Sequence, residues 1–406
     1  SQLGTYVGGQ SGGYSVYAQN GRTYAAGSNA TYMATPPTRT TIMIAYDADT
    51  RRLYFGADGH WGDGSGNTDE TFANAAVAHT VAAGKTYYPA GGFNSGSAFA
   101  NFGQQRFSFT PPTGYKALSS RNLPPNVPSI IRPQKHFESV TYSGTGSTNK
   151  IESLEFAPDL VWVKRRDATN YHILSDTIRG AGNYLVSNTT DAESSGGSQL
   201  INGFLKNGFQ VGTENAVNNG SGTYVAWCWK AGGSSNTFNI DGTGYATAAA
   251  AGLDGGTIDP TGASINTEAG FSIITYTGNG TAGANVAHGL GKKPAWIIIK
   301  ARSVGDKWFV YHHKADAGAG DGHVYAELQE TAAFINYPNM LNDTAPTDTL
   351  VTLNNDGAVN SGSRTYVMYC WAEIPGYSKF GIYKADARTD GPYVHTGFRP
   401  AFIWLL

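Results

Sequence analysis

Glycine-rich turns are the first features of this sequence that could hold a ligand. Residues 278–283, GNGTAG, fit the GxGxxG pattern in which a helix N-terminus holds the pyrophosphate of a dinucleotide. The residues that follow include Gly289, Gly291 and Pro294, which end any helix that could begin at this point. The pattern therefore indicates a glycine-rich hairpin, and we expect no bound nucleotide.

Histidines could ligate a transition metal. The densest group comprises His312, His313 and His323, and no HExxH or CxxC partner lies near it in the sequence. Solvated or capping histidines are the simpler interpretation, with a metal site as the alternative.

Aspartates could ligate a hard cation. Asp47 and Asp49, followed by Asp58, offer oxygen ligands of the kind that such ions prefer. Aspartate beside glycine is also what tight turns require, and we favour the turn. We therefore expect no cofactor, with a cation near Asp47 and Asp49 as the alternative.

Covalent catalysis has no local signature, since no GxSxG, no cysteine–histidine nucleophile pattern and no P-loop occurs in the sequence. Two carboxylates could still converge from distant strands, which keeps glycan hydrolysis open. Binding fits better, because glycan sites pair an exposed aromatic ring with Asn, Asp or Gln side chains. The basic run at 164–166 is interpreted as a solvated strand end. The candidate binding residues, near turns of the first domain, are Trp61, Tyr87, Tyr88 and Asp58.

Composition excludes several classes of protein. The chain has 406 residues, of which 53 are Gly, and only 14% of its residues are charged. With 28 Lys and Arg against 30 Asp and Glu, it lacks the positive excess that a nucleic-acid-binding protein needs. No run of about 18 apolar residues occurs, so we expect no membrane insertion by a helix. Two cysteines are too few for a disulfide framework.

Short strands are the elements that would position these residues. Apolar or alternating runs rich in β-branched and aromatic residues are bounded by Gly, Asn, Asp or Pro, as at 41–46, 160–163, 271–276 and 296–299. Many short strands with glycine-rich turns predict an all-β protein built of serial β-sandwich domains joined by linkers.

An internal repeat is the strongest signal of domain organisation. Three segments align without gaps between its two copies: 137–144 with 271–278, 158–164 with 294–300, and 223–229 with 365–371. Each copy carries one cysteine inside an apolar strand, which predicts a small buried side chain. The residues that we expect in the structural core of the repeats are Cys228, Cys370, Trp229, Trp371, Pro158 and Pro294.

Composition and the repeat together predict the domain boundaries. The predicted order is a first domain at 1–125, a linker at 126–136, repeat copy 1 at 137–231, a Gly/Ala/Ser/Thr-rich linker or insertion at 232–270, repeat copy 2 at 271–375, and an incomplete third copy at 376–406. The third copy is expected because FGIY at 380–383 and PAFIWLL at 400–406 repeat the first two strand motifs.

Motif order in the first domain carries a resemblance. The stretch YDADTRRLYFGADGHW at 46–61 is followed by YYPA at 87–90, NFGQ at 101–104 and a proline-containing exit at 109–124. This order resembles SPRY-type, concanavalin-like sandwiches, with an exit like that of bacteriophage tail and fibre proteins. The resemblance covers residues 1–125 and implies opening strands before residue 1, so we expect a truncated or unusual start.

Motifs of the second copy and its continuation carry another resemblance. They are HGLGKKP at 288–294, YVMYCW at 366–371, GYSKFG at 376–381 and GPYVHTGFRP at 391–400. They resemble repeats in structural proteins of marine and cyanobacterial phages. Copy 1 departs from the pattern, with LEFAP at 154–158 in place of the HGLG turn.

The resemblances imply a non-enzymatic virion protein of a tail, fibre or capsid-surface appendage, located on the virion surface. Its concanavalin- or jelly-roll-like sandwiches would adhere to a host-surface glycan or protein. They also imply self-association, as a homotrimer, and contacts with other virion proteins. One alternative is a decoration or cement protein that only stabilises a capsid or filament. A glycan depolymerase is the second alternative.

Overall fold

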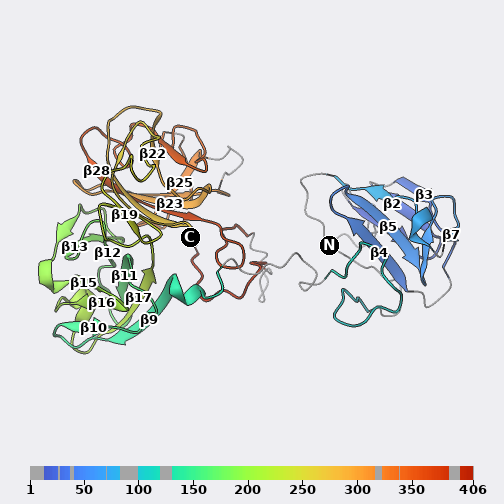
Figure 1. Cartoon of the computed structure of the whole chain (residues 1–406), viewed down its shortest axis with the longest axis horizontal. Coiled ribbons are helices and arrows are strands. Elements are labelled where there is room, and N and C mark those ends of the chain that lie inside the picture. The colour runs from blue at the N-terminus through green and yellow to red at the C-terminus, as the bar shows by residue number, and fades with distance from the viewer. Residues whose placement is uncertain are drawn as a thin grey trace. The chain divides into compact units, whose positions relative to one another are not determined.

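The computed structural model is an all-β protein with two compact units, Ser1–Pro125 and Asn126–Leu406, and it confirms the predicted fold class. The division falls where the sequence places the end of the first domain. The labels in Figure 1 identify the elements of each unit. The structure describes residues 13–25, 28–36, 41–69, 71–82, 99–118, 130–315, 322–337, 339–383 and 394–405.

The first unit contains two antiparallel sheets. One sheet has the order β1-β2-β3, with bounds Tyr14–Tyr17, Arg22–Ala25 and Ser28–Thr31. The other contains β4 (Ile42–Asp47), β5 (Arg52–Ala57), β6 (His60–Gly62) and β7 (Thr68–Asp69) in that order, with β8 (His79–Thr80) paired to β5. A 3₁₀ turn, η1, spans Phe72–Asn74. Strand β5 has apolar side chains on both faces, so the unit has two small cores.

The first repeat is a β-sandwich. Its large sheet has the order β14-β13-β12-β11-β17-β9, with bounds Ser194–Ser195, Asn183–Val186, Ile173–Asp176, Leu160–Arg165, Thr223–Trp229 and Phe137–Ser143. Its small sheet has the order β10-β16-β15, with bounds Asn149–Ile151, Gly208–Val211 and Ile201–Leu205. The short helical elements are η2 (Pro133–Lys135), η3 (Gly197–Gln199) and α1 (Asn215–Asn218). Val161, Phe209 and Cys228 lie in the core between the two sheets.

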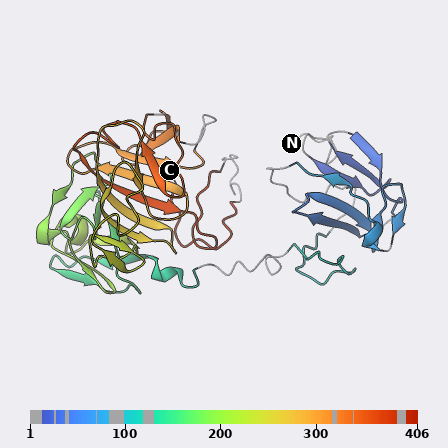
Figure 2. The same cartoon turned by 45° about the horizontal axis from the view of Figure 1, so that its top comes forward.

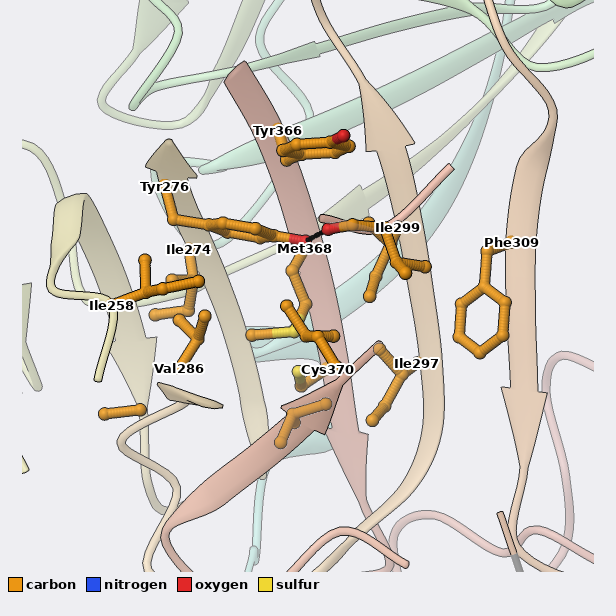
Figure 3. Close-up of a cluster of buried hydrophobic side chains, with 14 of the residues drawn as sticks. Ile258, Ile274, Tyr276, Val286, Ile297, Ile299, Phe309, Tyr366, Met368 and Cys370 are labelled. Atoms are coloured by element: carbon orange, nitrogen blue, oxygen red, sulfur yellow. Dashed lines mark hydrogen bonds between the residues drawn. The ribbon is translucent and has the colours of Figure 1, made fainter. Parts of the chain in front are cut away.

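The second repeat has the same plan with a longer sheet. The large sheet has the order β19-β18-β20-β21-β28-β23-β24-β25-β26, with bounds Thr243–Tyr245, Phe238–Ile240, Pro260–Asn266, Phe271–Thr277, Thr365–Ala372, Pro294–Ala301, Trp308–His312, Val324–Glu327 and Ile335–Asn336. The small sheet pairs β22 (Ala284–Ala287) with β27 (Leu350–Leu353). Figure 3 shows the core between them, where Ile274, Ile297, Met368 and Cys370 face Val286.

Strand register places the repeated residues at equivalent positions. Cys228 lies opposite Val161, and Cys370 lies opposite Ile297, on the equivalent strand pairs of the two sheets. Both cysteine side chains are fully buried. Pro158 precedes β11, and Pro294 begins β23, so each proline lies where the central strand starts.

Of the two interpretations of residues 232–270, a linker or an insertion, the structure favours the insertion. These residues contain strands β18, β19 and β20, and β20 pairs with β21 and extends the sheet of the second repeat. Small residues are needed on this strand because it runs close to its neighbours. A Cβ on Gly262 would lie 3.0 Å from Ile178 and 3.1 Å from Thr275. The small residues that make 232–270 resemble a flexible segment are therefore needed for close packing.

The two repeats share a core and are not independent sandwiches. The outer faces of the six-stranded and nine-stranded sheets pack on each other, which gives four sheet layers in the second unit. Figure 1 and Figure 2 both show the two large sheets stacked. We call this shared core the seam. Its buried residues are Leu160, Trp162, Leu174, Leu185, Trp229, Ala231, Phe271, Ile273, Trp296, Ile298, Trp308, Val310, Ala326, Val367, Tyr369 and Trp371.

The expected third copy has no named strand in the described residues 376–383 and 394–405. Phe402 and Trp404 pack against the seam, and the Trp404 ring lies 4.8 Å from Trp162 and 5.4 Å from Trp296. The segment therefore uses the aromatic residues of a strand motif to cover the edge of the seam.

Candidate functional site

Trp61 and Asp58 are the two predicted binding residues that the structure describes in the first unit, and neither belongs to an exposed aromatic site. Trp61 is only 6% exposed and packs edge-on against Phe72, with ring centroids 5.0 Å apart. Asp58 closes a turn, because its carboxylate accepts a 2.8 Å hydrogen bond from the Thr41 N–H. Trp61 is therefore core and not the open aromatic ring that we expected. Tyr87 and Tyr88 lie outside the described residues.

Asp47 also belongs to a turn. Its carboxylate accepts hydrogen bonds from the Thr50 hydroxyl at 2.6 Å and from the Asp49 N–H at 3.0 Å. These hydrogen bonds, those of Thr50 first, hold the pKa of Asp47 below its ordinary value. They account for both carboxylate oxygens, as the turn interpretation requires.

The histidines of the second repeat do not converge on one point. The His313 ring nitrogen lies 3.2 Å from the carbonyl of Phe380, whereas His323 pairs with Asp343. Burial lowers the pKa of His312 to about 4. Within the described ranges, no group of three or more His, Cys, Asp or Glu side chains could hold a metal ion.

The two cysteines are unsuited to nucleophilic chemistry. Each thiol is fully buried, and burial raises the pKa of Cys228 and of Cys370 well above the ordinary value. Because the thiolate is the reactive form, both thiols are inert at neutral pH.

Equivalent residues of the two repeats meet in the seam. Trp229 of the first repeat lies 6.0 Å, centroid to centroid, from Trp371, which is its counterpart in the second. Another equivalent pair, Lys164 and Lys300, has different surroundings in the two repeats, and this difference identifies the candidate site.

A buried ionic network closes one end of the seam. The Arg179 guanidinium donates to Asp176 at 2.6 Å, to Glu193 at 3.1 Å and to the Tyr369 hydroxyl at 3.2 Å. Tyr369 in turn donates to Asp176 at 2.7 Å, and Arg302 donates to both oxygens of Glu193. The Arg179 and Asp176 side chains are fully buried. The network thus joins charged groups of both repeats and fixes their relative orientation.

Lys300 lies at the same end and is covered by a loop of the first repeat. Its ammonium group donates to the carbonyls of Thr190 at 3.2 Å and Ala301 at 2.9 Å, and it lies 5.9 Å from the Trp308 ring centroid. The Lys300 side chain is fully buried, and burial lowers its pKa to about 8. The loop at 187–193 therefore closes over this lysine.

Lys164 is the counterpart of Lys300 in the first repeat, and it is not covered in this way. It lines an open hollow of about 410 Å³, to which the second repeat contributes no lining residue among those that the structure describes. We call it the Lys164 hollow. Its lining residues are Lys164, Arg166, Asp167, Ala168, Thr169, Asn170, His172 and Asn188.

The chemistry of the Lys164 hollow suits a polar ligand. Burial, with a smaller effect of Lys164, lowers the pKa of His172, so its ring is neutral near pH 7. Asp167 is paired with Arg165 at 2.9 Å, which lowers the pKa of Asp167 to about 2. Tyr171, next in the chain to two lining residues, is 54% exposed. The hollow thus combines basic groups, amides and a neighbouring aromatic ring.

Sequence reasoning missed this site. The basic run at 164–166 indicates only a solvated strand end, and Tyr171 belongs to none of the sequence motifs. A signal was present in the repeat, since Lys164 and Lys300 close the same aligned motif. The motif shows that the two lysines are equivalent, but only the structure shows that one is covered.

A family model described as a domain of unknown function, DUF7483, matches residues 132–405, which include both repeats and the segment after them. No curated protein and no solved structure matches the chain. None of the helices in the described part of the chain has the length and apolar character needed to cross a membrane.

Proposed function

The chain belongs to the DUF7483 family. We propose that it is a non-enzymatic structural protein of a bacteriophage tail, fibre or capsid-surface appendage. Its role is to hold a host-surface glycan in the Lys164 hollow while its fused sheets supply a rigid support. The phage setting comes from the motifs that resemble virion repeats.

The rigidity of the second unit supports a holding role. Four sheet layers with three apolar cores leave the two repeats little freedom to move against each other. The ionic network between them is buried and hydrogen-bonded, so opening the seam would expose unpaired charges. Such a scaffold suits an external protein that resists proteolysis.

The contrast between Lys164 and Lys300 is the observation that carries the binding proposal. The structure shows how a covered lysine is satisfied in this repeat, by two backbone carbonyls above an aromatic ring. Lys164 has the same place in its repeat but borders open space. A glycan carboxylate or hydroxyl would supply the oxygen atoms that the loop supplies at Lys300. Arg166 adds a second positive charge, which favours an acidic sugar.

Binding of a carboxylated polysaccharide tests this proposal. We expect the full chain to bind alginate more tightly than neutral dextran, and added salt to weaken the binding. Lys164→Gln should weaken alginate binding about fivefold or more, as expected for one lost charge-assisted contact. Lys150→Gln is the matched control, since Lys150 is an exposed lysine on β10. Equal binding by the two variants would refute the site.

Two further observations separate the alternatives. Incubation with the polysaccharide should release no new reducing ends, and their release would identify a depolymerase. Antibody against the chain should label tails or appendages of purified phage particles in electron micrographs. An even label over the capsid, without polysaccharide binding, would instead identify a decoration protein.

A further inference from the structure

Strand β9 is a long edge strand. It has seven residues and forms one end of the six-stranded sheet, where β17 is the only strand paired with it among the residues that the structure describes. The other edges of the two large sheets, β14, β19 and β26, have two, three and two residues. Proteins commonly protect sheet edges by keeping them short or by placing Lys, Pro or a bulge there. Strand β9 has no Lys or Pro, Glu138 is its one charged residue, and its register with β17 is continuous.

The second repeat shows what this edge can accept. Strand β21 is the counterpart of β9, and it pairs with β28 on one side and with β20 on the other. Strand β20 runs antiparallel to β21, and small residues, Gly262, Ala263 and Ser264, lie opposite its centre. In the described part of the first repeat, no strand lies beside β9 in the way that β20 lies beside β21.

The backbone of β9 presents its unused groups outward at alternate residues. The Gly144 N–H donates to Gly222, and the Lys230 N–H donates to the carbonyl of His136, so even-numbered residues direct their polar groups toward β17. By alternation, Phe137, Ser139, Thr141 and Ser143 direct their N–H and C=O groups away from the sheet. The side chains of the last three are exposed, polar and small.

We propose that β9 pairs antiparallel with β9 of a second copy of this chain, about a two-fold axis through Val140. In this register Ser139 lies opposite Thr141 of the second copy, and both residues have outward-facing polar groups. Glu138 lies opposite Tyr142 of the second copy, so no like charges face each other. The two six-stranded sheets become one continuous sheet, and the symmetric contact closes as a dimer.

The pairing also follows the pattern set by β20. Small residues of β20 lie opposite the centre of β21, and Ser139 and Thr141 at the centre of β9 are small as well. A two-fold pair differs from the trimer that the phage resemblance implies. The number of chains in the complex therefore distinguishes the two.

Sedimentation velocity of the full chain over a wide concentration range tests the proposal. We expect a reversible monomer–dimer equilibrium. Thr141→Pro removes one outward N–H from each copy, hence two hydrogen bonds from the dimer, and should weaken dimerisation about tenfold or more. Thr141→Lys should act similarly by adding a charge to the edge. Thr223→Lys, at an exposed position on β17, is the control and should leave the equilibrium unchanged.

Amide hydrogen exchange supplies a direct readout. The N–H groups of Ser139 and Thr141 should exchange more slowly at high chain concentration, while those of Val140 should change little. Circular dichroism and thermal unfolding check that each variant folds. If Thr141→Pro does not fold, Thr141→Lys alone tests the dimer contact. The proposal is overturned if the chain stays monomeric, and this includes the case in which the β9 edge binds a strand of another protein. It is also overturned if the chain forms a trimer, or if both Thr141 variants leave the dimer intact. Polysaccharide binding at Lys164 can succeed or fail independently of this result.

Discussion

Replacing Arg179 by Met tests whether the buried ionic network holds the repeats together. Arg179 contacts Asp176, Glu193, the Tyr369 hydroxyl and the Leu174 carbonyl, and its side chain is fully buried. Methionine fills much of the space but leaves the carboxylate of Asp176 buried without its cation. Removing one partner of a buried ion pair costs about 3–5 kcal/mol, because the remaining charge is uncompensated. We expect Arg179→Met to lower the free energy of unfolding by that amount.

Urea or guanidinium unfolding followed by tryptophan fluorescence measures this loss. Trp229 and Trp371 meet in the seam, so their emission reports on its opening. Arg132→Met is the matched control, since Arg132 pairs with Glu155 at the surface. Exposed pairs contribute at most about 1 kcal/mol, and the control should change stability by no more than that.

The reasoning fails if Arg179→Met changes stability as little as the control does. The double variant Arg179→Met, Asp176→Asn sharpens the test, because it removes the stranded negative charge as well. It should recover part of the loss, since the cost of the single change comes largely from Asp176. A double variant less stable than Arg179→Met would show that lost contacts, and not an uncompensated charge, account for the effect.

Three further perturbations test the packing of the second unit. The pKa of Lys300 is lowered to about 8 in the folded chain, against an ordinary value of 10.5. Between these two pH values the unfolded chain binds more protons than the folded chain, so the free energy of unfolding rises with pH. Unfolding midpoints at pH 8 and 10 should therefore show a gain in stability that Lys300→Gln lacks. Cys228 and Cys370 should react with a thiol reagent only after denaturation, as a colorimetric time course would show, and fast labelling of the native chain would contradict their burial. Trp404→Ala should lower the free energy of unfolding by about 1–3 kcal/mol, because it uncovers the edge of the seam. It should also shift tryptophan emission to the red, and unchanged emission would argue against this packing.

The strands and their equivalence in the two repeats could be predicted from the sequence. The matching motifs of the cysteine strands, and the β-branched runs bounded by glycine, indicated strands that the structure contains. These signals are local, since they depend on side-chain alternation and turn residues. They therefore survive in a single sequence without knowledge of which surfaces meet.

The shared core was missed although its signal was present. Leu160 to Val163 form an unbroken apolar run, and such runs are typical of strands buried on both faces. The run does not say what covers the second face, and a linker or insertion at 232–270 is compatible with two separate sandwiches. The structure shows that Trp162 faces the seam while Val161 faces the core of its own repeat. Long-range packing of this kind depends on geometry that periodicity does not encode.

The unequal ends of the seam have a sequence cause. By strand register, Val186 corresponds to Glu327, so Glu193, seven residues on, corresponds to Phe334. Glu193 binds Arg179 and Arg302 and holds its loop over Lys300, whereas Phe334 packs into the apolar seam. The second repeat therefore has no carboxylate at this position to hold an equivalent loop over Lys164. Lys300 is thus covered by a loop of the first repeat, whereas its counterpart Lys164 borders the open hollow.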